Sequence, residues 1–135
     1  MNILYVGNFK PAHSTENHLA YELEILGHTV ARVQEDETTP EVLSQAIKNI
    51  PGIDLFLFTR TWGKTVTMDH INALRSIGIP SVSYHLDLYI GLKREKDLDD
   101  DPFWKTDYVF TPDGDPRSAD IFKAKGINHI YQWPG

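Results

Sequence analysis

A histidine and an aspartate stand two residues apart in the segment Ser83-Tyr84-His85-Leu86-Asp87-Leu88. Imidazole titrates near neutral pH, and a carboxylate beside it can orient the ring, so the two side chains could form an acid/base pair. On extended backbone both would face the same side, because a strand alternates its faces. The alternative is a buried histidine satisfied by a backbone carbonyl. We take His85 as the first catalytic candidate and Asp87 as the second.

The segment 7–14 reads Gly-Asn-Phe-Lys-Pro-Ala-His-Ser and supplies four further candidates. Gly7, Asn8 and Ser14 could bind an anion or another substrate group through free N–H groups at the start of a helix. His13 is a second candidate base, because the dipole of the following helix favours its neutral form. The alternative is structural, with Gly7 in a tight turn and Ser14 as a helix cap.

Arg60 and Trp62 follow the most apolar run of the chain. Arg60 could hold a carboxylate or phosphate through two hydrogen bonds, and Trp62 offers a flat face to a sugar or base. The alternative is a surface loop with a half-buried tryptophan. Asp113, in a loop after a later strand, is the remaining candidate for substrate binding.

Several kinds of site are excluded or disfavoured. The chain has no cysteine, which excludes disulfides, thiol catalysis and cysteine-ligated metals. Neither the G-x-G-x-x-G nor the G-x-x-x-x-G-K-[ST] motif is present. The D-x-D patterns in residues 97–101 and 113–115 could chelate a divalent cation. The first lies among lysines and an arginine and indicates a solvated charged segment, so we expect no metal site.

The charge balance limits the class of partner. Lys plus Arg is 13 and Asp plus Glu is 19, so the net charge is −6. This excess of acid argues against a nucleic-acid partner and against an anionic membrane surface. No apolar run is long enough to span a bilayer, and the first residues do not resemble a signal peptide, so we expect a cytoplasmic protein.

Short apolar runs alternate with helical patterns along all 135 residues. They predict strands near residues 3–6, 29–33, 53–58, 81–84, 108–110 and 129–131, with helices between most of them. Three helices end in a glycine that a strand follows almost at once, at Gly27, Gly78 and Gly126. Such units form right-handed parallel crossovers. We predict a single α/β domain over residues 1–135, with a doubly wound, Rossmann-like open parallel sheet of about six strands and helices on both faces.

This fold would gather the candidate residues, because the loops after parallel strands meet at one edge of the sheet. Two helices carry apolar residues at helical spacing that we expect to face the core. They are Leu19, Leu23 and Leu26 in the first helix and Ile71, Leu74 and Ile77 in the third.

Several segments together match the pattern of a known enzyme family. Residues 2–7, Asn-Ile-Leu-Tyr-Val-Gly, precede a helix whose residues Glu16 to Leu26 fit E-x-H-x-x-x-L-A-x-x-L only loosely, and then Gly27-His28-Thr29-Val30. This opening resembles the start of GT-B glycosyltransferases. Residues 81–88 look like the family's strand that ends in a His-Asp type motif. Residues 108–114, 122–127 and 133–135 resemble the segment that closes the N-terminal half, most closely in the spore-maturation-protein-like members.

The resemblance implies the acceptor-binding half of a glycosyltransferase, which moves a sugar from a nucleotide-sugar donor to an acceptor hydroxyl. Such a half would be inactive without a C-terminal donor-binding domain. Its partners would be that domain and a small-molecule or glycan acceptor, with the nucleotide sugar as co-substrate and no other cofactor. His85 would act as a base or hold the transferred sugar, while Arg60 and Trp62 would position the acceptor. The alternative is a stand-alone Rossmann-like or flavodoxin-like module for binding or signalling.

Overall fold

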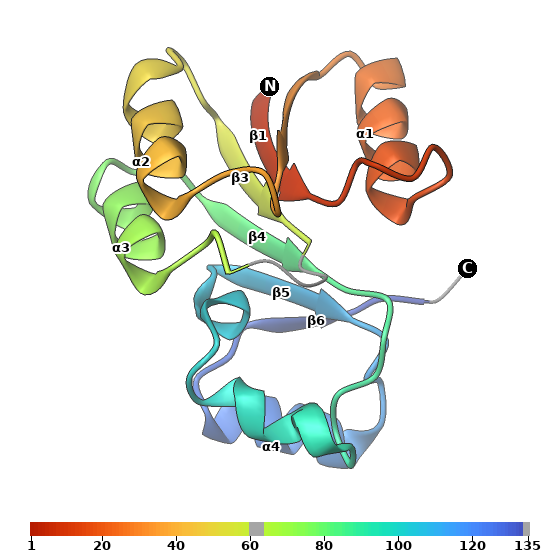
Figure 1. Cartoon of the computed structure of the whole chain (residues 1–135). Coiled ribbons are helices and arrows are strands. Elements are labelled where there is room, and N and C mark those ends of the chain that lie inside the picture. The colour runs from red at the N-terminus through yellow and green to blue at the C-terminus, as the bar shows by residue number, and fades with distance from the viewer. Residues whose placement is uncertain (60–63, 134–135) are drawn as a thin grey trace.

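A computed structural model describes residues 1–59 and 64–133. Its sheet has six parallel strands in the order β2-β1-β3-β4-β5-β6 (Figure 1). The strands are β1 (Asn2–Gly7), β2 (Thr29–Gln34), β3 (Leu55–Phe58), β4 (Ser81–Tyr84), β5 (Tyr108–Thr111) and β6 (His129–Tyr131). The predicted Rossmann-like open parallel sheet is confirmed.

Four α-helices and two short 3₁₀ helices connect the strands. They are α1 (Thr15–Ile25), α2 (Pro40–Asn49), α3 (Met68–Ser76), η1 (Lys93–Leu98), η2 (Pro102–Lys105) and α4 (Pro116–Ala124). Side-chain caps begin three of the α-helices, because Ser14, Thr39 and Asp115 each accept a hydrogen bond from a backbone N–H of the first turn. Within the described part of the chain, no helix has the length and apolar character needed to cross a membrane.

The strand order decides which face each helix covers. From β1 the chain moves outward to β2, and from β2 onward every step runs the other way across the sheet. Because such crossovers are right-handed, α1 must lie on one face and the later helices on the other (Figure 1). Helices α2, α3, η1, η2 and α4 together form the larger core, which includes Phe56, Phe58, Trp104 and Phe122. Of the described helices, α1 alone packs in the smaller core, around Tyr5.

Two of the predicted core stripes are wrong in part. Leu19 and Leu23 are only half-buried, and Leu26 is 72% exposed. The buried residues of α1 are Glu16 and Ala20 instead. In α3, Ile77 follows the last helical turn and is also exposed. The leucines of α1 are open because no described element covers the sheet beside that helix.

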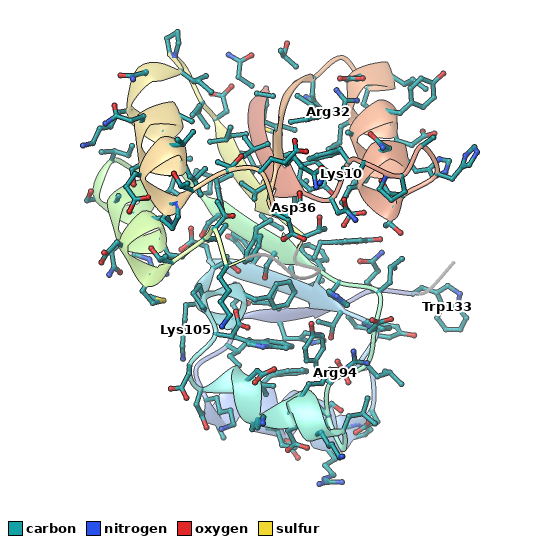
Figure 2. The ribbon with its side chains drawn as sticks, in the orientation of Figure 1. Lys10, Arg32, Asp36, Arg94, Lys105 and Trp133 are labelled. Atoms are coloured by element: carbon teal, nitrogen blue, oxygen red, sulfur yellow. The ribbon has the colours of Figure 1, made fainter. Side chains whose placement is uncertain are left out.

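This open part of the sheet forms an apolar groove of about 470 Å³. Leucines of α1 and β3 form one side, and Val82, Tyr84 and Phe110 continue it across β4 and β5. Trp133 closes the far end, where it is 74% exposed and projects outward just after β6 (Figure 2).

Candidate functional site

The chain order of the sheet reverses at β1, which has β2 on one side and β3 on the other. In open parallel sheets, ligands bind beyond the carboxyl ends of the strands at such a switch point. A pocket of about 240 Å³ opens at this edge. Its lining comes from the start of α1 and the ends of β3 and β4, and consists of Thr15, Glu16, Thr59, Tyr84, His85, Leu86 and Asp87.

Glu16 is a buried carboxylate in the wall of this pocket. It is 6% exposed although it lies in the first turn of a surface helix. The absence of a side chain at Gly7 makes room for it, since a Cβ there would lie 2.7 Å from Glu16 Cγ and 2.6 Å from Thr59 Oγ1. The positive end of the α1 dipole favours its negative charge. Among the described residues, none donates a hydrogen bond to this carboxylate or forms an ion pair with it.

Thr59 presents an acceptor to the pocket. Its hydroxyl donates a hydrogen bond to the Tyr5 phenol oxygen over 3.1 Å, so the remaining capacity of its oxygen is for accepting. Tyr5 is fully buried, and burial raises the pKa of Tyr5 well above its ordinary value. The hydrogen bond from Thr59 partly offsets this rise in pKa, and the nearby Glu16 carboxylate adds to it. Tyr5 is therefore a neutral phenol at all ordinary pH values.

His85 and Asp87 lie together after β4, as the sequence predicts. The Asp87 amide N–H donates to His85 Nδ1 over 3.0 Å, and one Asp87 carboxylate oxygen lies 3.8 Å from the same nitrogen. Because Nδ1 accepts, the neutral form of the ring carries its proton on Nε2. The ring packs edge-on against Tyr89 and Phe103, with centroids 5.3 Å and 6.0 Å away. Whether His85 acts as a base or holds a sugar oxygen stays a prediction.

Tyr84 gives the β4 side of the pocket a second hydroxyl. Its oxygen accepts a hydrogen bond from Gln132 Nε2 over 2.6 Å, which leaves the phenol proton available to donate. Donors therefore gather on the β4 side, at Tyr84 and His85. Acceptors gather on the α1 and β3 side, at Glu16 and Thr59.

The second predicted base, His13, does not line this pocket. His13 is exposed, and its ring lies 6.3 Å from that of His18 on the outer side of α1. Arg60 and Trp62 lie outside the described residues. Their roles stay predictions.

The first loop is held by contacts of its own. Ser14 caps α1 by accepting from the Asn17 amide over 3.1 Å. The Asn8 side chain accepts from Gln34 Nε2 over 3.0 Å. Lys10 is paired with Asp36 over 2.8 Å (Figure 2), and the hydrogen bond from its ammonium holds the pKa of that carboxyl below its usual range.

Gly7 serves the close packing of Glu16 and Thr59. None of Gly7, Asn8 and Ser14 lines the pocket. Direct binding of a substrate by these three stays a prediction.

Asp113 has a structural role, because it fixes a loop next to the site. It is 3% exposed, and its carboxylate accepts from the backbone amides of Tyr89 and Ile90 and from the Thr111 hydroxyl. These bonds fix the loop that follows His85. Asp113 does not line the pocket, so contact between this residue and a substrate also stays a prediction.

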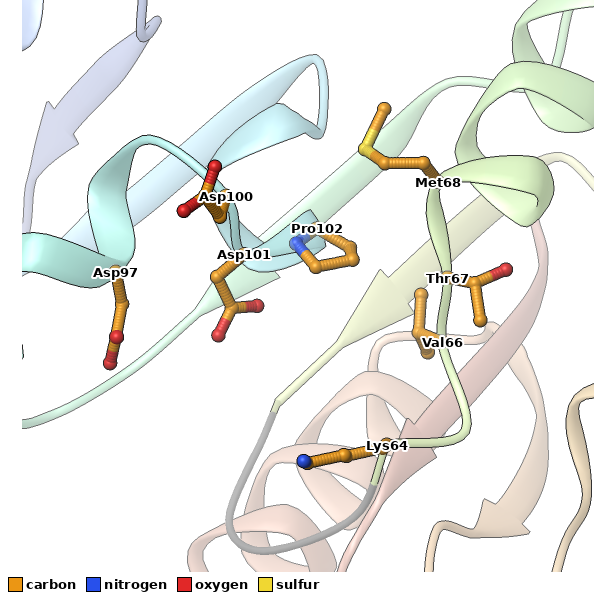
Figure 3. A pocket seen from close by; sticks show the side chains of 8 residues that line it. All are labelled: Lys64, Val66, Thr67, Met68, Asp97, Asp100, Asp101 and Pro102. Atoms are coloured by element: carbon orange, nitrogen blue, oxygen red, sulfur yellow. The ribbon is translucent and has the colours of Figure 1, made fainter.

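A second pocket of about 340 Å³ lies between the segment before α3 and the two 3₁₀ helices (Figure 3). Three aspartates of residues 97–101 form one wall, and Lys64, Val66 and Met68 are on the other. Asp101 caps η2 by accepting from the Phe103 amide. No group of three or more acidic or histidine side chains in the described ranges is arranged to hold a metal ion. We regard this pocket as a charged surface hollow.

Sequence reasoning missed Glu16, Thr59 and Tyr84 as members of the site. The only signal for Glu16 was an acidic residue in the first turn of a helix that follows a strand-ending glycine. Its burial depends on how closely the ends of β1 and β3 approach α1, which no local pattern predicts.

Comparison with protein-family models, with curated proteins and with solved structures finds no match.

Proposed function

We propose that this chain is the acceptor-binding half of a glycosyltransferase, and that the pocket at the ends of β3 and β4 takes the acceptor. A GT-B enzyme works in a cleft between two halves, so the chain alone would transfer no sugar. A C-terminal donor-binding domain and a nucleotide-sugar co-substrate would complete the reaction.

The observation that carries the proposal is the composition of the pocket. It combines two carboxylates, hydroxyls and an imidazole within about 240 Å³, and no lysine or arginine of the described residues lines it. Pockets for drug-sized ligands measure roughly 300 to 1,000 Å³, so this one suits a single ring with several hydroxyls. In the proposal His85 holds a sugar oxygen through Nε2–H, which is the second of the two roles that the resemblance implies for it.

The same composition disfavours binding of the donor's phosphates here. A phosphate needs free N–H groups or cations. Glu16 already places a negative charge at the start of α1, and Lys10 is engaged with Asp36 and Glu37. These charges fit a domain that leaves the nucleotide sugar to its other half.

The strand order supports a second candidate, a binding or signalling module without catalysis. The order β2-β1-β3-β4-β5 is that of flavodoxin-like sheets. However, a receiver domain needs an acidic pair after β1 and an aspartate after β3, where this chain has Gly7-Asn8 and Thr59. A flavodoxin needs a phosphate cradle, which Phe9-Lys10-Pro11 does not resemble.

Calorimetry of this chain with nucleotide sugars, flavin mononucleotide and free sugars tests the proposal. We expect no binding of UDP-, GDP- or TDP-sugars at concentrations that would saturate a micromolar complex, no binding of the flavin, and weak binding of free sugars. Tight, stoichiometric binding of any nucleotide sugar would contradict the assignment to the acceptor half. Tight binding of the flavin would support the second candidate instead.

A further inference from the structure

Glu16 is a charged group that the described protein leaves without a partner. It is 94% buried by residue surface, yet it lines an open pocket. A buried carboxylate is costly unless it receives hydrogen bonds or faces a positive charge. Among the described residues only the partial positive charge at the start of α1 offsets it, so a cationic ligand in the pocket would supply hydrogen-bond donors that the protein does not.

The charges around the pocket favour a cation as that ligand. Two carboxylates line it, at Glu16 and Asp87. Asp87 is partly compensated by Arg94, whose guanidinium lies 3.5 Å away, whereas the described residues place no such cation beside Glu16. The pocket is thus negative on the side formed by α1 and β3.

A metal ion fits this site poorly, whereas an ammonium group fits it well. No group of three ligating side chains surrounds Glu16 in the described ranges. An ammonium brings three donors of its own. One can bond the Glu16 carboxylate, and a second can bond the Thr59 oxygen, whose own proton is given to Tyr5.

We propose that the acceptor carries a protonated amine beside its hydroxyls, as an amino sugar does, and that Glu16 and Thr59 hold this amine. The donors at Tyr84 and His85 then face the ligand's oxygen atoms on the opposite side of the pocket. This inference rests on the proposed function, since it narrows the acceptor from any hydroxyl compound to an amino compound of sugar size. Charge-assisted hydrogen bonds are about twice as strong as neutral ones, so the amine should dominate the affinity.

Nuclear magnetic resonance titrations of the 135-residue chain with three matched sugars test the inference. Glucosamine, N-acetylglucosamine and glucose differ at one position, and only the first carries a positive charge. We expect glucosamine to shift the amide signals of Thr15, Glu16, Thr59 and His85, with an affinity roughly tenfold or more above that of the two neutral sugars. Equal affinities for the three sugars, or no shift with any of them, would overturn the inference.

Two variants test whether Glu16 is the source of the preference for glucosamine. Glu16→Gln keeps the shape of the side chain and removes its charge, so it should abolish the difference between glucosamine and glucose. Glu22→Gln removes an exposed charge from the same helix and should leave the difference unchanged. A Glu16→Gln protein that keeps both its fold, judged by its amide spectrum, and its preference for glucosamine would refute the role of Glu16.

The outcomes separate this inference from the proposed function. Neutral sugars that bind in the pocket without any preference for the amine would overturn the inference and leave the acceptor-domain proposal standing. Tight binding of a nucleotide sugar alone would overturn that proposal, while a preference for glucosamine that depends on Glu16 would still stand.

Discussion

Gly7 and Glu16 approach so closely that no side chain fits between them. A Cβ at Gly7 would lie 2.7 Å from Glu16 Cγ, well inside van der Waals contact. The Glu16 side chain therefore packs directly against the backbone at the end of β1. This explains how a charged residue in the first turn of α1 comes to line a pocket at the sheet edge.

Gly7→Ala should destabilise the fold and disturb the site together. The added methyl group would meet both Glu16 and Thr59, and overpacking of this kind costs roughly 1 to 3 kcal/mol. Urea denaturation measures the loss. In the double variant Gly7→Ala/Thr59→Ala, the Thr59 Oγ1 contact is gone, so the combined loss should be smaller than the sum of the single losses. Strict additivity would show that the close contact does not limit this position.

Asp113→Asn should loosen the loop that carries the site. The carboxylate accepts from Tyr89, Ile90 and Thr111, and an amide can replace only part of this. We expect a loss of about 1.5 to 3 kcal/mol in unfolding free energy and faster hydrogen exchange at the amides of Tyr89 and Ile90. Asp120→Asn, at an exposed position of α4, is the control and should change neither quantity.

His129 should make stability depend on pH in the mildly acidic range. Burial lowers the pKa of His129 below its ordinary value, and the Asp113 carboxylate only partly offsets this. Below about pH 6.5 the unfolded chain therefore binds a proton that the folded chain resists, so the unfolding free energy falls as the pH drops. Above that pH the contribution is constant.

Thermal or urea unfolding between pH 8 and about pH 5 checks this dependence. His129→Gln should flatten the decline on the acid side, because the group that binds the extra proton is gone. His13→Gln removes an exposed histidine and should leave the pH profile of the parent protein. A profile for His129→Gln that matches the parent would contradict the assignment.

His85→Ala separates binding from packing. The ring contacts Tyr89 and Phe103, so we expect a modest loss of roughly 1 kcal/mol in stability. The lost Nε2–H should also weaken the binding of neutral sugars by roughly threefold to tenfold. His85→Gln can supply an N–H donor and should recover part of the affinity but little of the packing. Unchanged sugar affinity in folded His85→Ala would support the alternative of a core histidine.

Much of the fold can be predicted from the sequence because its determinants are local. The caps at Ser14, Thr39 and Asp115 and the helix-ending glycines each act over a few residues. The apolar runs between them place the six strands, and the handedness of crossovers then decides the faces. The pairing of His85 with Asp87 is local too, but it arises in a bend after β4, where the Asp87 amide donates to His85 Nδ1, and not on extended backbone.

The remaining features depend on contacts between distant segments. The half-exposed Leu19 and Leu23 have a good helical stripe, but the groove beside them is left open by the order of the strands. Glu16 is buried only because β1 ends in Gly7 directly beneath it. The sequence indicates only that Asp113 lies in a loop. Its hydrogen-bond partners at Tyr89 and Ile90 lie in a loop more than 20 residues earlier, which no local pattern predicts.

A crystal structure of this chain soaked in concentrated neutral monosaccharides tests most directly whether the pocket beside Glu16 is an acceptor site. We expect one sugar ring in this pocket, with an oxygen atom within hydrogen-bonding distance of His85 Nε2 and a hydroxyl donating to Glu16 or Thr59. Sugar bound in the aspartate-lined pocket of Figure 3, or at the first loop with the pocket beside Glu16 empty, would contradict it.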